Sequence, residues 1–284
     1  MSSAEATAAR LRALLTEARH AVAFTGAGIS TESGIPDYRS DAGRARRRDR
    51  ARHSFRAYVG SPEVRAEAWR ARAALWRDPP RPNAGHRALV RLERAGRLAG
   101  IVTQNVDGLH RDAGSHRVVE LHGSTRIVAC IGDTPRSGTP EGCGLRLCHT
   151  WALERLAEGA TDPACPSCGG LLKTTSVSFG QNLWPGTLEA ARDLLDGADL
   201  VLIVGTSLAV APAAGLPRAA AHDGADLVII DPQPTPLDEA ATLVIRARAG
   251  TVLEAVAADD APPPASGSAV ATAATTTTAA LERT

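Results

Sequence analysis

Short apolar runs punctuate the chain at intervals that suit buried strands. The runs at 21–25, 101–103, 200–204 and 227–230 are each followed closely by Gly, Asn, Asp or Ser. Runs of this length bounded by small polar residues predict strands buried on both faces of a sheet.

Segments with helical periodicity lie between these runs, at 82–97, 188–195 and 211–222. One more helix is predicted before the first strand, because Leu11, Leu14 and Leu15 recur at helical spacing. Strands that alternate with helices indicate an α/β fold, an open parallel Rossmann-like sheet with helices on both faces. Ligands of such sheets bind at the carboxyl ends of the strands, so the polar loops after the runs are the first candidates for a site.

Two insertions interrupt the alternation, at about 40–77 and 127–172, and we expect them to form a smaller module. The first carries an arginine run between Arg44 and Arg56, which predicts either a solvated helix or loop, or a contact with phosphate or nucleic acid. We expect residues 1–257 to form the catalytic domain. The Ala/Thr/Pro-rich tail at 258–284 is predicted to be disordered, because it has no apolar periodicity.

Composition narrows the choice of partners. The 284 residues carry 32 Lys+Arg against 31 Asp+Glu, a net charge of +1, so neither nucleic acid nor a membrane surface is expected. No apolar run approaches the roughly 20 residues of a membrane span, and the N-terminus lacks a signal-peptide pattern. The expected location is the cytoplasm. A single lysine, Lys173, stands among the basic residues.

All five cysteines lie between Cys130 and Cys168. An odd, clustered set fits neither a disulfide framework nor scattered core thiols. The C-x2-C pair formed by Cys165 and Cys168 has the spacing of a metal knuckle, so a metal site is expected in this insertion.

Two loops have the small residues that a phosphate group requires. The sequence TGAGIS at 25–30 places Gly26 and Gly28 directly after a strand, where the backbone can approach a pyrophosphate closely. The third glycine of the dehydrogenase fingerprint is replaced by Thr31, so this signal is weak alone. The Gly-Thr-Ser sequence at 205–207 repeats the pattern after another strand.

A third loop has polar side chains of the kinds found in catalytic sites. TQNVDGLH at 103–110 puts Gln104, Asn105 and Asp107 together after a strand, a combination that a structural turn rarely needs. His122 follows in ELHG and is a candidate general base because of this company. The other histidines, including His86 and His110, are expected to have surface or structural roles.

These motifs together resemble the sirtuins, the Sir2 family of NAD-dependent protein deacylases, and in particular its actinobacterial members. The matching segments, in family order, are TGAGIS–ESGIPDYR (25–39), TQNVDGLH (103–110), ELHG (120–123), CPSCGG (165–170), SFGQ (178–181) and GTSL (205–208). The resemblance implies removal of acyl groups, most simply acetyl, from protein lysines, with NAD consumed to give nicotinamide and O-acyl-ADP-ribose. The Tyr-x-x-Arg pair of sirtuins that prefer acidic acyl groups is not found after Tyr58.

The resemblance also implies roles for individual residues. His122 would act as general base, with Asn105 positioning water and ribose and Asp107 beside the nicotinamide. The residues expected at NAD are Gly26, Ala27, Gly28, Ile35, Asp37, Tyr38, Arg39, Gln104, Asn105, Asp107, Gly205, Thr206, Ser207 and Asp231. The acyl-lysine tunnel would be bordered by Val177, Phe179 and Gly180, where a peptide is expected to add as a strand.

The chain departs from the family pattern in its first zinc knuckle. Cys130 stands in place, but Asp133 occupies the position of the expected second cysteine. Three ligands, Cys130, Cys165 and Cys168, are therefore expected to hold a structural zinc. The fourth remains open among Asp133, Cys143 and Cys148, with Cys143 chosen because Cys143-Gly144 mimics the end of a knuckle. At the adenosine ribose, Asp231 replaces the usual asparagine.

Two other functions compete with deacylation. The same NAD site could serve mono-ADP-ribosyl transfer, or the chain could be an NAD-binding sensor with weakened catalysis. His122, Asn105 and Asp107 argue against a sensor, whereas Asp133 argues for one. The sequence leaves the protein substrate, the acyl preference and the oligomeric state open.

Overall fold

The computed structural model describes residues 3–37, 39–41, 51–133, 140 and 142–258. The predicted tail, apart from residue 258, lies outside these residues, as do Tyr38 and most of the arginine run. Within this part of the chain, no helix has both the length and the apolar character to cross a membrane.

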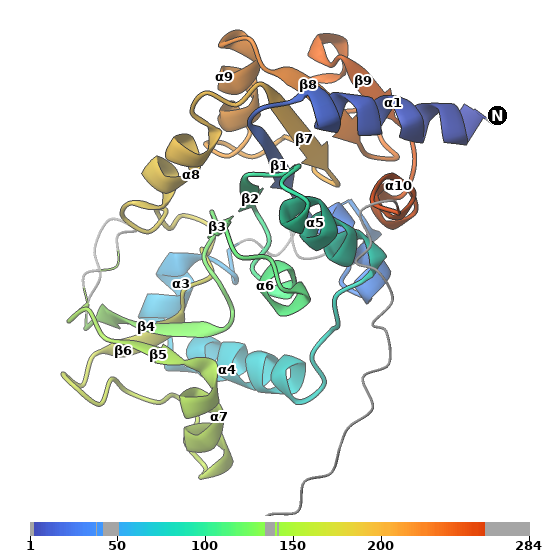
Figure 1. Cartoon of the computed structure of the whole chain (residues 1–284). Helices are drawn as coiled ribbons and strands as arrows, with labels where there is room; N and C mark the ends of the chain where they lie inside the picture. Colours follow the sequence, from blue (N-terminus) through green and yellow to red (C-terminus); the bar gives the residue numbers. More distant parts are fainter. Residues whose placement is uncertain (1–2, 38, 42–50, 134–139, 141, 259–284) are drawn as a thin grey trace, which may run out of the picture.

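A parallel sheet of six strands forms the larger part of the molecule, in the order β3-β2-β1-β7-β8-β9 (Figure 1). Its strands are β1 Ala21–Thr25, β2 Gly100–Thr103, β3 Val118–Glu120, β7 Leu200–Val204, β8 Asp226–Ile230 and β9 Leu243–Ile245. All four strands predicted from the apolar runs are present, with β2 and β8 each one residue longer. The short strands β3 and β9 at the two edges were not predicted.

Helices cover both faces of this sheet, as predicted. Their bounds are α1 Ser3–Glu17, α5 Ala84–Arg94, α6 Leu109–Ala113, α8 Thr187–Leu195, α9 Gly215–His222 and α10 Ala249–Val256, with 3-10 turns η1 Ala27–Ser33 and η2 Asp238–Ala240. Alternate residues of each strand enter opposite cores. Ala23 of β1 packs with α1, α5 and α10, whereas its neighbour Phe24 packs with α8 and α9. This alternation explains why the strands read as continuous apolar runs.

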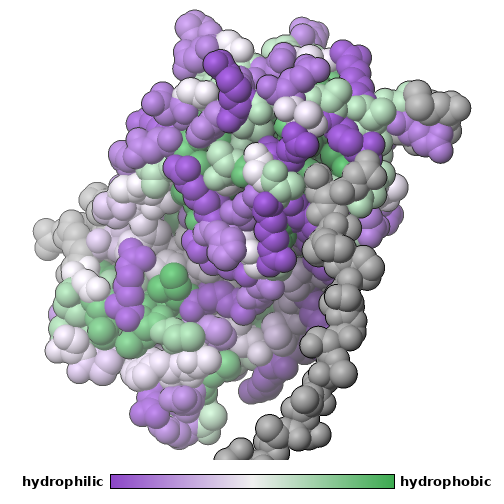
Figure 2. All heavy atoms as spheres, in the orientation of Figure 1, coloured by the Kyte–Doolittle hydropathy of each residue, from purple (hydrophilic) through white to green (hydrophobic). Residues whose placement is uncertain are grey.

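The described parts of the two insertions pack together in a small module. Among the described residues it contains the antiparallel sheet β5-β4-β6 and the helices α3, α4 and α7 (Figure 1). The bounds are α3 Phe55–Gly60, α4 Pro62–Arg77, β4 Ile127–Gly132, β5 Arg146–Cys148, α7 His149–Ala157 and β6 Leu171–Thr174. Trp69 of α4 is fully buried against Val128 and Leu172, so the first insertion closes the core of the second. Figure 2 shows apolar side chains gathered on this module, while the larger part of the same face is mostly hydrophilic.

The order of the sheet locates the ligand crevice. The strands β2 and β7 lie on opposite sides of β1, so the chain reverses its winding between β1 and β7. In doubly wound sheets a nucleotide binds at this switch point, outside the carboxyl ends of the strands. The loops after β1, β2, β7 and β8 therefore form the walls of the crevice.

Candidate functional site

The loop after β1 lies directly against the loop after β7. Gly28 donates its backbone N–H to the carbonyl oxygen of Gly205 at 2.8 Å. A Cβ atom on Gly28 would lie 2.6 Å from the Cα atom of Gly205, so only glycine fits here. The glycines let the two loops approach each other closely, and a pyrophosphate can come near backbone that carries no side chain at these positions. The predicted phosphate loops thus meet, and the residues present fit a dinucleotide.

The loop after β2 is tied into the same crevice by hydrogen bonds. The Nδ2 atom of Asn105 donates to the carbonyl oxygen of Gly26 and to the hydroxyl of Ser30, both at 3.1 Å. Ser30 in turn donates to Asp107 at 2.8 Å. Since both hydrogens of the amide are engaged inside the protein, its oxygen Oδ1 is left to accept a hydrogen bond from a ligand. Gln104 donates to the Thr206 hydroxyl across the switch point, at 2.7 Å.

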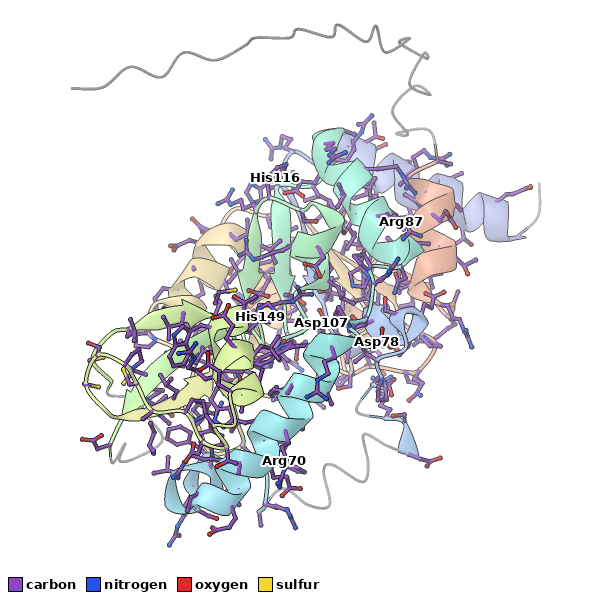
Figure 3. The ribbon with its side chains drawn as sticks, turned by 90° about the horizontal axis from the view of Figure 1, so that it is seen from below. Arg70, Asp78, Arg87, Asp107, His116 and His149 are labelled. Carbon is purple, nitrogen blue, oxygen red and sulfur yellow. The ribbon has the colours of Figure 1, made fainter. Side chains whose placement is uncertain are left out.

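Asp107 lies at the seam between the two modules. Figure 3 shows it where the larger sheet faces α4. Burial raises its pKa, while hydrogen bonds from the Leu109 N–H and the Ser30 hydroxyl oppose this shift. A carboxylate held in this way can stabilise positive charge that develops on a bound ribose.

His122 stands at the end of β3, on the same side of the sheet. Its Nδ1 atom lies 3.1 Å from the carbonyl oxygen of Gln104. Because a carbonyl only accepts, Nδ1 carries the proton and Nε2 is left with a lone pair. Burial lowers the pKa of His122, although the Gln104 hydrogen bond opposes this. The imidazole is therefore neutral at pH 7, as a general base requires.

The segment predicted to border the acyl-lysine runs next to this histidine. The backbone N–H of Val177 donates to the carbonyl oxygen of His122 at 2.8 Å. The next residues are open to solvent, since Phe179 is 38% exposed and Gly180 is also exposed. The carbonyl of Phe179 is held by the N–H of Phe55 at 2.8 Å. This exposed segment beside His122 is the place where a peptide could bind.

A cavity lies on the other side of the switch point, at the ends of β7 and β8. Its lining residues are Gly28, Thr31, Asp37, Arg39, Gly205, Ile230, Asp231, Pro232, Gln233, Arg248 and Ala249. Arg39 and Asp231 form an ion pair across it at 2.9 Å. Asp37 is in this cavity too, where it accepts hydrogen bonds from the backbone N–H groups of Arg39 and Ser40. The contact of Asp37 with NAD that the resemblance implies stays a prediction.

Four cysteines converge in the small module. The Sγ atoms of Cys130, Cys143, Cys165 and Cys168 all lie within 4.8 Å of one another. Four thiolates at this spacing are the ligand set of a structural zinc ion, and they fit it without any other residue. Neither Asp133 nor Cys148 belongs to this group among the described residues. The chain thus replaces the missing second cysteine of the first knuckle by Cys143, thirteen positions after Cys130 in the sequence.

Some contributors to the site were missed from the sequence. His110 is fully buried and contacts the Thr25 hydroxyl at 2.9 Å, and Thr25 donates to Thr103 at 2.8 Å. Burial lowers the pKa of His110 to about 3, so it remains neutral. His86 is buried as well. The structural role expected for both is consistent with these positions. In the sequence, Thr25, Thr103 and His110 each belong to one of the polar loop motifs. Their mutual contact was not predictable from those motifs, because it depends on the pairing of β1 with β2.

Comparison with known proteins agrees with this geometry. The profile of the Sir2 family matches residues 26–212, which include the loops after β1, β2 and β7, His122 and the cysteine cluster. The chain belongs to the Sir2 family. A Streptomyces coelicolor protein named NAD-dependent protein deacetylase 2 is 44% identical over 240 residues, covering 82% of this chain and 94% of that protein. A protein of Aeropyrum pernix named NAD-dependent protein deacylase is 41% identical, covering 83% and 90%.

Solved sirtuin structures have the same fold. A structure from work on the mechanism and regulation of Sir2 enzymes superposes on this chain with a TM-score of 0.76 at 34% identity. The match covers 90% of this chain and 98% of the other. A Sir2 homologue in complex with NAD gives 0.73 at 33% identity, covering 89% and 93%. Sir2Tm bound to a propionylated peptide gives 0.73 at 32% identity, covering 88% and 97%.

Proposed function

We propose that this sirtuin removes acyl groups, most simply acetyl, from lysines of protein substrates in a reaction that consumes NAD. The observation that carries the proposal is the neutral His122, with its Nε2 atom available, beside a crevice in which Asn105 and Asp107 are held by Ser30. Relatives with 41–44% identity bear the names NAD-dependent protein deacetylase and deacylase.

Each half of NAD has a set of residues suited to it. The glycine cradle at Gly28 and Gly205 would receive the pyrophosphate, and Asp231 would receive the adenosine ribose. The nicotinamide ribose would lie near Asn105 and Asp107. NAD would supply an activated ribose carbon, whose bond to nicotinamide can be replaced by a bond to the acyl oxygen of the substrate.

The chain's own residues then have three tasks. His122 accepts a proton from a ribose hydroxyl at Nε2, because its Nδ1 proton is committed to Gln104. Asn105 orients water or a hydroxyl through Oδ1. Asp107 contributes a buried negative charge that opposes the positive charge developing as the glycosidic bond breaks.

The acyl-lysine would enter beside the contact of Val177 with His122, and its peptide would lie along the exposed segment around Phe179. The zinc cluster lies away from these residues, in the core that closes on Trp69. It supports the module that holds one wall of the tunnel. Since thiolate ligands require reduced cysteines, this site suits a reducing compartment such as the cytoplasm.

The test is nicotinamide release with an acetyl-lysine peptide and NAD, compared with the same peptide bearing free lysine. We expect release only with the acylated peptide, and its loss in His122→Ala by about a thousandfold or more, the scale of a lost general base. His116→Ala is the matched control, because His116 is exposed at the amino end of β3, away from the crevice (Figure 3).

The same assay separates the other functions. Labelled ADP-ribose retained on protein, with the acyl group left in place, would support ADP-ribosyl transfer. Binding of NAD without nicotinamide release, under any acyl group offered, would support a sensor.

A further inference from the structure

The single lysine of the chain is buried in the small module. Lys173 belongs to β6 and is 3% exposed. Its Nζ atom donates to the carbonyl oxygen of Thr174 at 3.3 Å and to the carbonyl oxygen of Ser176. It also lies 5.8 Å from the centre of the ring of Tyr58, on α3. The amine is thus directed at the segment that leaves β6, and not at solvent.

A positive charge at this position is costly. No carboxylate pairs with Lys173 in the described part of the chain, and the charged group that acts on it is Arg72 of α4. Burial and the positive charge of Arg72 lower the pKa of Lys173 from 10.5 to about 7. The neutral amine still has two N–H donors for the two carbonyls. Because an apolar side chain would avoid the cost of a buried charge, stability does not explain why a lysine stands here.

Lys173 holds one end of a peptide group that contacts the histidine of the site. The carbonyl of Ser176 and the N–H of Val177 belong to the same planar peptide bond. Lys173 donates to the oxygen of this group, while its N–H donates to the backbone carbonyl of His122 at 2.8 Å. A hydrogen bond to the oxygen polarises the N–H, so each contact strengthens the other. The amine of Lys173 and the carbonyl of His122 together fix the orientation of this peptide plane.

The side chain of Ser176 has partners of its own. Its hydroxyl contacts the Thr174 hydroxyl at 2.8 Å and accepts a hydrogen bond from Arg72 at 3.2 Å. Neither contact involves the backbone carbonyl. Among the described residues, Lys173 alone donates to the carbonyl oxygen of Ser176.

This peptide plane lies where the acylated peptide would arrive, because Val177 begins the segment that becomes exposed at Phe179. We infer that Lys173 is a positioning residue for the acyl-lysine substrate. By holding the carbonyl of Ser176, it keeps the segment at Val177 against His122 in the orientation that receives the peptide. The inference rests on the proposed deacylation, and it gives a buried residue of the small module a part in peptide affinity.

The first experiment replaces Lys173 by methionine, which removes both hydrogen bonds and keeps an unbranched side chain. The dissociation constant and KM for an acetyl-lysine peptide should rise about tenfold, the scale of a buried carbonyl left without its donor. KM for NAD and kcat should change by less than about threefold, because Gln104 and not this peptide plane orients the imidazole of His122. Lys173→Arg keeps N–H donors at this position and should restore much of the peptide affinity.

Arg155→Met is the matched control. Arg155 also lies over an aromatic ring of the small module, 5.9 Å from the ring centre of Trp151, but it belongs to α7 and pairs with Glu158. Its loss should leave peptide affinity at the parent value. The denaturant midpoint of Lys173→Met should stay near that of the parent, since the variant also removes a buried charge. A large fall in this midpoint, with equal rises of both KM values, would indicate a merely structural role and overturn the inference.

The second experiment uses the unaltered protein. Since the chain has a single lysine, labelling lysine with carbon-13 gives one labelled side chain, and its ε-methylene NMR signal belongs to Lys173. Saturation with the unlabelled acetyl-lysine peptide, without NAD, should shift this signal, because the peptide plane that Lys173 holds then contacts the substrate. Fluorescence anisotropy of the same peptide gives the dissociation constant and defines saturation.

A signal that does not move at saturation would overturn the inference, even if Lys173→Met failed to fold. So would parent-like peptide affinity in a folded Lys173→Met protein. If the unaltered protein binds the peptide but releases no nicotinamide with NAD, the proposed deacylation fails instead, and the affinity and the NMR signal still decide the inference. A protein that binds no acetyl-lysine peptide would overturn both.

Discussion

The Nδ1 atom of His122 lies 3.1 Å from the backbone carbonyl oxygen of Gln104. One contact thus fixes both the tautomer of the base and its position relative to the loop that carries Asn105. Because the acceptor belongs to the backbone, the contact depends on the register of β2 with β3, where Thr103 pairs with Glu120. The sheet itself therefore orients the catalytic imidazole.

The first prediction concerns pH. Burial lowers the pKa of His122 below its ordinary 6.5, so the base is neutral above that lowered value and is lost as pH falls through it. The rate of deacylation should be flat near pH 7 and fall along an acid limb whose midpoint lies below 6.5. The measurement is kcat/KM against pH.

Titration of the histidine ring signals by NMR tests whether His122 is the group responsible for the acid limb of the rate profile. The signal that is absent in His122→Asn should titrate with the same midpoint as the rate. A midpoint above 6.5 in both measurements would contradict the burial argument. Circular dichroism at each pH is the control for folding.

The second prediction concerns the metal. Cys143→Ser should reduce zinc from about one ion per chain to a small fraction, because a structural site needs four protein ligands. Cys148→Ser and Asp133→Asn should retain the metal, since neither residue belongs to the four-cysteine group. Metal analysis of the three purified variants checks this.

These variants also decide between the ligands that the sequence left open. Full zinc in Cys143→Ser together with loss in Asp133→Asn would show that the carboxylate of Asp133, and not the thiol of Cys143, completes the site. The melting temperature should fall only in the variant that loses zinc.

The third prediction concerns the phosphate cradle. Gly28→Ala places a Cβ atom 2.6 Å from the Cα atom of Gly205 and 2.7 Å from its carbonyl oxygen. Both neighbours are backbone, so the two loops must separate, at a cost of about 1–3 kcal/mol. Affinity for NAD should fall about tenfold or more, since every 1.4 kcal/mol corresponds to about that factor.

Gly60→Ala is the control for this variant, because no atom lies within 4 Å of the added Cβ. It should leave both NAD affinity and the melting temperature near the parent values. Parent-like NAD binding in Gly28→Ala would mean that the loops do not meet as closely as the geometry indicates.

Much of this arrangement was predictable from local pattern. The buried strands were visible because parallel strands covered on both faces are apolar at every position, and the motifs around Gly26, Asn105 and His122 lie at their ends. The fourth zinc ligand was predictable only as one of three candidates. Its choice depends on how the segment before β5 returns to Cys130, which is a long-range contact.

The ion pair between Arg39 and Asp231 was also not predictable from local sequence pattern. Both residues were expected at the cofactor, but 192 positions separate them, and nothing in either motif predicts that they meet. Their contact follows from the pairing of β1 with β7 and of β7 with β8. Residues that contact one another through tertiary structure in this way leave no periodic signal.

The last prediction concerns Arg65, which joins α3 and α4 to the second insertion. It is 8% exposed, pairs with Asp162 at 2.7 Å, and donates to the carbonyl oxygens of Tyr58 and Val59 at 3.1 and 2.9 Å. Arg65→Met leaves Asp162 without its partner and two carbonyls unsatisfied. The free energy of unfolding should fall by about 3 kcal/mol, as when one partner of a buried pair is removed.

Arg52→Met is the control, because the pair of Arg52 with Glu67 is exposed and contributes about 0–1 kcal/mol. Arg65→Met should also raise KM for the acylated peptide more than KM for NAD. The reason is that Phe55 of α3 holds the carbonyl of Phe179, so loosening α3 disturbs the peptide segment but not the glycine cradle. Denaturant unfolding and two-substrate kinetics test the two effects separately, and equal loss in Arg52→Met and Arg65→Met would refute the role of burial.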